Sequence, residues 1–136
     1  MDVRNLKSKD PIVEHGGTCL SYFFYDKEEL REQTMGSYLE FVAEFELKDG
    51  ARLEPHYHDS DEFYYILRGS AVMWIEGERR VLEQGDLVHI PRNAVHSIWP
   101  SEEDGSFRAL SFATSFMLEG RTGHIPVPER AAELDR

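Results

Sequence analysis

Two histidines and a glutamate lie close together in one short stretch of the sequence. His56 and His58 are separated by one residue, and Glu62 follows four positions after the second histidine. Residues i and i+2 of a strand point to the same side, so the two imidazoles can converge on one ion. Turn-forming residues at positions 59–61 allow a returning strand to bring Glu62 beside them. The pattern predicts a metal site, although an H-x-H pair alone is also consistent with two surface histidines.

The spacing of glycines around this stretch narrows the interpretation. Gly50 precedes the H-x-H-x-x-x-E stretch by five intervening residues, and Gly69 follows it by six. Fifteen residues later a second stretch, GDLVHIPRNAVH, runs from Gly85 to His96. The two stretches resemble the two signature motifs of the cupin superfamily, and the resemblance covers roughly residues 39–116. It implies an all-β, jelly-roll barrel whose metal ion is bound by His56, His58, Glu62 and His96.

Two positions depart from the usual form of the second motif. Asn93 stands where glycine is usual, and Trp99-Pro100 occupies a place where asparagine is common. Asparagine tolerates left-handed backbone conformations better than other residues except glycine, so we expect the turn at Asn93 to be preserved. Neither departure touches a ligand position.

The resemblance places three imidazoles and one carboxylate around the ion. This mixed nitrogen and oxygen set suits Fe, Mn, Ni, Co or Zn. Four protein ligands leave one or two open positions on a five- or six-coordinate ion, and an open position is what catalysis requires. We therefore expect one divalent metal ion as the cofactor.

Tyr64 is the candidate catalytic side chain. It lies two residues beyond Glu62, hence on the same face of the strand and directed towards the ion. Its phenol can serve as a general base beside a Lewis acid, an arrangement that some cupin lyases resemble. The alternative is that Tyr64 fills the barrel with its hydroxyl hydrogen-bonded.

Other residues capable of chemistry carry weaker signals. His89 is out of phase with its neighbours in the second motif and is not expected to bind metal. His15 and His124 are isolated in the flanks, where surface positions are expected. Cys19 lies far in sequence from the histidine pair and is expected to be buried or inert.

The elements that must position these residues are short strands. Residues 18–25 are expected to form one strand, and residues 39–47 alternate cleanly, with Glu40, Glu44 and Glu46 on the wet side. Gly-containing turns then recur at short intervals, which is typical of a β-barrel or sandwich. We divide the single domain into an N-terminal arm and first strand (1–38), a barrel (39–118) and a C-terminal tail (119–136).

The composition restricts the partners. The 136 residues fit one domain, and 26 acidic against 15 basic residues give a net charge of -11, which disfavours nucleic acids and anionic membranes. A single cysteine and the lack of a signal-like or membrane-spanning apolar run predict a cytoplasmic protein. The strand at 62–68 is apolar on both faces, so its outer face is expected to pack on a second sheet or form a homodimer interface.

The predicted function is that of a metal-dependent enzyme acting on a small organic molecule, with dioxygenase as the leading reaction. One alternative is oxygen-independent lyase, isomerase or cyclase chemistry in which Tyr64 moves a proton. The other is a cupin that binds a small ligand or metal without turnover.

Overall fold

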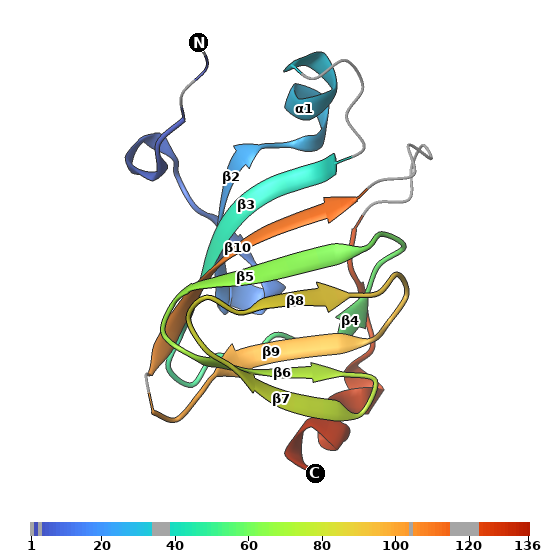
Figure 1. Cartoon of the computed structure of the whole chain (residues 1–136). Helices are drawn as coiled ribbons and strands as arrows, with labels where there is room; N and C mark the ends of the chain where they lie inside the picture. Colours follow the sequence, from blue (N-terminus) through green and yellow to red (C-terminus); the bar gives the residue numbers. More distant parts are fainter. Residues whose placement is uncertain (1, 3, 34–38, 104, 115–122) are drawn as a thin grey trace.

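The chain folds into two antiparallel β-sheets. The computed structural model describes residues 2, 4–33, 39–103, 105–114 and 123–136, and Figure 1 shows how its strands are arranged. One sheet has the strand order β1 (Ile12–Glu14), β2 (Cys19–Tyr25), β3 (Leu39–Lys48), β10 (Ser106–Thr114), β5 (Glu62–Arg68) and β8 (Leu87–Ile90). The other has the order β11 (Ile125–Pro126), β4 (His56–Tyr57), β9 (His96–Pro100), β6 (Ala71–Ile75) and β7 (Glu78–Leu82). The predicted all-β, jelly-roll class is confirmed.

In the part of the chain that the structure describes, helical structure is confined to short segments. Helix α1 (Lys27–Gln33) follows β2, and the Asp26 carboxylate caps it by accepting a 2.8 Å hydrogen bond from the Glu29 amide. The 3-10 segments are η1 (Leu6–Ser8), η2 (His15–Gly17) and η3 (Pro128–Asp135). Among the described residues, no helix is long and apolar enough to cross a bilayer.

Most of β3 follows the predicted alternation. Phe45 and Leu47 are buried, whereas Glu44 and Glu46 point outwards and pair with Arg108 of β10 at 3.0 and 3.1 Å. The apolar face of the strand thus contributes to the core between the sheets.

Glu40 breaks this alternation, and its predicted position on the wet side is wrong. Thr114 pairs with Leu39 and Ala113 with Phe41, so Glu40 is an extra residue in the ladder at a β-bulge. At a bulge one strand carries an extra residue, so side chains on the two sides of the bulge no longer alternate between the faces of the sheet in one continuous pattern. The Glu40 side chain is therefore buried at 7% exposure.

The flanks of the chain extend both sheets. The N-terminal segment supplies β1 and β2 to one edge of the larger sheet, and β11 of the C-terminal segment pairs with β4. The predicted boundaries at residues 38 and 118 fall outside the described residues. The homodimer and the cytoplasmic location stay predictions.

A small second core anchors the C-terminal segment. Leu134 of η3 is 1% exposed and packs with Trp74 and Val95. Arg130 pairs with Glu76 at 2.8 Å and lies over the Trp74 ring. These contacts keep η3 on the smaller sheet, at the end of the molecule opposite the N terminus (Figure 1).

Candidate metal centre

Three histidines converge at one end of the space between the sheets. His56 on β4 lies directly opposite His96 on β9, and their ring centroids are 4.3 Å apart. His58 follows β4, with its ring 5.0 Å from that of His96. The ligand nitrogens of the three residues all lie within 4.8 Å of one another.

Backbone hydrogen bonds orient the three rings in the same way. In each histidine Nδ1 lies within hydrogen-bond distance of a carbonyl oxygen two residues away, so Nδ1 carries the proton and donates it. The acceptors are Glu54 for His56 (2.7 Å), Ser60 for His58 (3.1 Å) and Ala94 for His96 (2.9 Å). The Nε2 atoms of His56 and His96 are left with lone pairs available to an ion, and His96 Nε2 is buried without a hydrogen-bond partner among the described residues. His58 Nε2 instead lies 2.5 Å from Glu62 Oε2 and donates a proton to that carboxylate, which a bound ion would replace.

The strands that carry the histidines are held together by contacts outside the regular ladder. The Asn93 amide donates to the His58 carbonyl at 2.8 Å, and the Ser97 hydroxyl donates to the Leu53 carbonyl at 2.7 Å. Asn93 has φ 64°, so the expected left-handed turn at this position is confirmed. The second motif therefore supplies His96 and also positions the backbone of His58.

Glu62 adds a carboxylate to the cluster. It begins β5 and is 6% exposed, with Oε2 2.5 Å from His58 Nε2 and 3.7 Å from His96 Nε2. All four predicted ligands are thus brought into one cluster. Imidazole nitrogens with one carboxylate oxygen form a donor set that fits a divalent transition metal ion.

The environment keeps two of the imidazoles neutral. Burial lowers the pKa of His96 to about 4 and lowers the pKa of His56 further. Burial also acts against protonation of His58, but its contact with the Glu62 carboxylate outweighs this and raises the pKa of His58. Neutral imidazoles beside a carboxylate are the protonation states that metal binding requires.

Tyr64 lies where its strand parity predicts, on the same face as Glu62. It is 3% exposed, and its ring packs edge-to-face on Phe45 with centroids 4.9 Å apart. Burial, together with the nearby Glu62 charge, raises the pKa of Tyr64 well above 10. The phenol is therefore protonated at neutral pH in the metal-free protein and presents a hydroxyl to the site.

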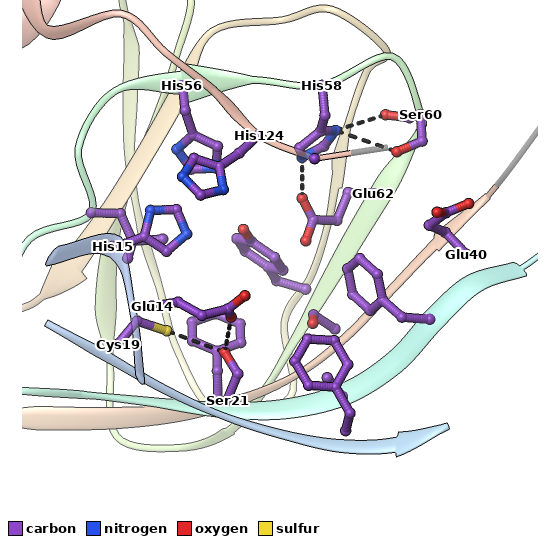
Figure 2. A pocket seen from close by; sticks show the side chains of 18 of the residues that line it. Glu14, His15, Cys19, Ser21, Glu40, His56, His58, Ser60, Glu62 and His124 are labelled. Carbon is purple, nitrogen blue, oxygen red and sulfur yellow. Dashed lines mark hydrogen bonds and ion pairs between the residues drawn. The ribbon is translucent and has the colours of Figure 1, made fainter. Parts of the chain in front are cut away.

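A cavity of about 320 Å³ adjoins the histidine cluster. Its lining includes Tyr64 and three of the candidate ligands, His56, His58 and Glu62, whereas the fully buried His96 lies behind them. Figure 2 shows His56, His58 and Glu62 facing a common space with side chains of the N-terminal segment. Aromatic side chains form part of the walls, namely Phe23, Phe41 and Phe45. The volume is in the range of small-molecule sites.

His15 and His124 also border this cavity, where sequence reasoning did not place them. The two rings stack on each other with centroids 4.4 Å apart, and the His15 ring lies 4.7 Å from that of His56 (Figure 2). The expected surface position is wrong for His15, which is partly buried, and burial followed by the nearby His124 lowers its pKa to about 4. His124 is exposed as expected but lies at the cavity because β11 pairs with β4.

Two other candidates lie as expected. Cys19 is buried, its Sγ lies 3.6 Å from the Ser21 hydroxyl, and burial raises the pKa of its thiol to about 11. Such a thiol is a poor nucleophile at neutral pH. His89 is half exposed and pairs with Asp61 at 2.8 Å, outside the cluster.

The fold and the cluster agree with the comparison to known families. The Cupin domain model of the Cupin_2 family matches residues 43–112, and this chain belongs to the cupin family.

Individual relatives cover different shares of the chain. The tetracenomycin polyketide synthase protein TcmJ of Streptomyces glaucescens is 31% identical over 109 residues, which is 76% of this chain and 71% of that protein. Quercetin 2,3-dioxygenase of Bacillus subtilis is 37% identical over 68 residues, which is 49% of this chain but only 20% of that enzyme. The structure of the polyketide cyclase RemF from Streptomyces resistomycificus superimposes with a TM-score of 0.74 at 18% identity, covering 98% of this chain and 93% of RemF. The last comparison supports the fold alone.

Proposed function

We propose that this cupin is a metal-dependent enzyme acting on a small organic molecule bound in the cavity. The observation that carries the proposal is the convergence of the three histidines, with Glu62 against His58 and His96, at the edge of a cavity of about 320 Å³. In this proposal one divalent ion is held by His56, His58, Glu62 and His96. Fe, Mn, Ni, Co and Zn all suit this donor set.

The residues around the cluster have distinct roles in this proposal. The bound ion would supply a Lewis acid with an open position for a substrate oxygen. Phe45 lines the cavity, packs against Tyr64 and excludes water from the reacting end of the substrate. The Tyr64 hydroxyl, buried beside Glu62, donates a hydrogen bond or a proton within the same space.

The reaction that we propose first is a dioxygenation. The similarity to quercetin 2,3-dioxygenase supports it, over the 68 residues that the two proteins share. The test is substrate-dependent oxygen uptake by the Fe(II)-loaded protein with enols, diketones, catechols and flavonols. We expect uptake with at least one class and loss of uptake in His58→Ala. Full iron loading without oxygen uptake for any class would count against a dioxygenase.

The position of Tyr64 favours a second candidate, an oxygen-independent lyase, isomerase or cyclase. A buried phenol within the cavity can deliver or accept one proton without O2. Tyr64→Phe removes the hydroxyl alone. Under this candidate, turnover of a substrate should fall by about 10²-fold or more while metal content stays stoichiometric. Unchanged turnover in that variant would remove the proton-transfer role, and stoichiometric metal without any turnover would leave a ligand-binding protein.

A further inference from the structure

Glu40 is a buried carboxylate that the proposed metal site does not use. The β-bulge opposite Ala113 and Thr114 takes Glu40 out of the outward-facing series of Glu44 and Glu46 and places it in the lining of the cavity. Bulges are found beside functional sites, where they redirect a side chain. The local break in periodicity therefore has a specific result: one acidic side chain is moved from the surface into the cavity wall.

Only half of this carboxylate has a partner. Oε1 lies 3.2 Å from Lys27 Nζ at the start of α1. Oε2 is buried and has no hydrogen-bond partner among the residues that the structure describes. Leaving a buried charged acceptor unpaired costs free energy. A ligand that donates a hydrogen bond to Oε2 would remove this cost.

The surroundings of Glu40 define what kind of donor fits. Phe41 and Phe23 line the cavity beside it and contact each other edge-to-face, with centroids 5.8 Å apart. These rings favour a flat aromatic group next to the carboxylate. A ligand ammonium is disfavoured because the Lys27 ammonium already occupies the other oxygen and would repel a second cation. A neutral donor is therefore favoured, and on a flat aromatic group a phenolic hydroxyl is the simplest one.

Glu40 lies across the cavity from His56, and Glu62 lies between them: Glu62 pairs with Ala113 of β10, and Ala113 pairs with Phe41, the residue after Glu40. Figure 2 shows Glu40 on the opposite side of the cavity from His15 and His56. A substrate with one oxygen at the histidine cluster would thus carry its second polar group towards Glu40.

We propose that Glu40 is a specificity-determining residue whose Oε2 accepts a hydrogen bond from a phenolic hydroxyl on the side of the substrate away from His56. The substrate class is then a hydroxylated, planar aromatic compound with oxygens at both ends. The inference rests on the proposed function in one respect, since it takes the same cavity as the substrate site.

The test compares two probes, 2-naphthol and 2-methoxynaphthalene, in which a methyl group replaces the hydroxyl hydrogen and removes the donor. The Glu40 variants separate the lost hydrogen bond from the effect of the added methyl group. Binding of each is measured by isothermal titration calorimetry to the chelator-treated, metal-free protein. We expect the wild-type protein to bind 2-naphthol about tenfold more tightly than the ether, which is typical of a hydrogen bond to a charged group. Glu40→Ala should abolish this preference. Glu40→Gln, which keeps the side-chain size and a neutral acceptor, should retain a preference of only a few-fold.

The matched control is Glu44→Ala. Glu44 lies on the same strand and is also ion-paired, with Arg108, but faces outwards. This variant should keep the full preference. Absent binding of 2-naphthol, equal binding of the two probes by the wild type, or an unchanged preference in both Glu40 variants would overturn the inference.

A separate variant distinguishes this inference from the proposed function. His58→Ala should lose metal binding while keeping the tenfold preference for 2-naphthol, since Glu40 and the aromatic wall are intact. A wild-type protein that binds no metal would refute the metal-dependent enzyme but leave the probe measurement standing. A lost preference with metal binding intact would refute the role of Glu40 alone.

Discussion

The histidines of the metal centre differ in how readily they accept a proton. His96 is fully buried, and its pKa of about 4 lies below the ordinary value of 6.5. In the pH interval between these two values His96 is protonated in the unfolded chain but neutral in the folded protein. Stability therefore rises with pH across this interval and is lost as pH falls through it. His58 acts in the opposite sense, because its raised pKa stabilises the fold at low pH and this contribution is lost as pH rises.

This difference predicts acid sensitivity of the metal-free protein. Because the pKa of His96 is about 4 in the folded protein and 6.5 in the unfolded chain, His96 alone should lower the free energy of unfolding by about 3 kcal/mol between pH 7 and pH 4. Urea unfolding of the chelator-treated protein at several pH values measures this change in the free energy of unfolding. His96→Gln should reduce this loss of stability by about 3 kcal/mol, and the part that comes from His56 and His15, whose pKa values burial also lowers, should remain. An equally steep profile for His96→Gln and wild type would show that His96 is not the titrating group.

Sequence spacing identified the metal ligands but not all the residues around them. His56, His58 and His96 could be predicted because strand parity and two short motifs determine which way they point. His15 and His124 carry no such signal, since each comes from a flank and reaches the cavity through pairing of distant segments, β2 with β3 and β11 with β4. Long-range pairing of this kind leaves no local pattern in the sequence.

At the level of elements, β3 also has a feature that depends on a distant segment and cannot be predicted from its own sequence. Its alternation correctly predicts buried Phe45 and Leu47, but period-two reasoning cannot detect a bulge, because the extra residue is visible only in the register against β10. Glu40 was therefore predicted on the wrong face. Asn93 shows the opposite case, where a local conformational preference was sufficient to predict the turn.

The turn between β5 and β6 offers a test of why the first motif ends in glycine. Gly69 has φ 75°, and a Cβ at this position would lie 2.3 Å from the Ser106 carbonyl oxygen. Gly69→Ala should destabilise the fold by about 2 kcal/mol or more, because backbone strain and a backbone clash add together. Gly77→Ala is the matched control, with φ 91° but no atom within 4 Å of the added Cβ.

The two variants separate strain from contact. Urea unfolding should show a clearly larger loss for Gly69→Ala than for Gly77→Ala, which suffers only the unfavourable φ. Equal losses of stability in the two variants would mean that the close approach of β10 to Gly69 adds nothing to the destabilisation. Glycine would then be required at this position for its positive φ alone.

For the molecule as a whole, the two sheets bring both ends of the chain to one site. β2 and β3 carry the N-terminal side of the cavity, β4 and β9 carry the histidines, and β11 adds His124 from the C-terminal segment. Folding must therefore be largely complete before the ligands converge. A metal ion that binds the assembled cluster binds the folded state in preference to the unfolded one, and binding and stability are linked.

This linkage predicts how the whole protein responds to metal removal. At a free metal concentration 100 times the Kd, stabilisation amounts to about 2.7 kcal/mol, and a chelator should remove it. Thermal unfolding with and without added Fe(II), Co(II), Ni(II), Mn(II) or Zn(II) measures the shift in Tm. His58→Ala should abolish the shift for every ion, whereas His89→Ala, whose side chain pairs with Asp61 outside the cluster, should show the full shift. If His58→Ala kept the wild-type shift, the stabilising ion would be bound elsewhere and the cluster of His56, His58, Glu62 and His96 would not be the metal site.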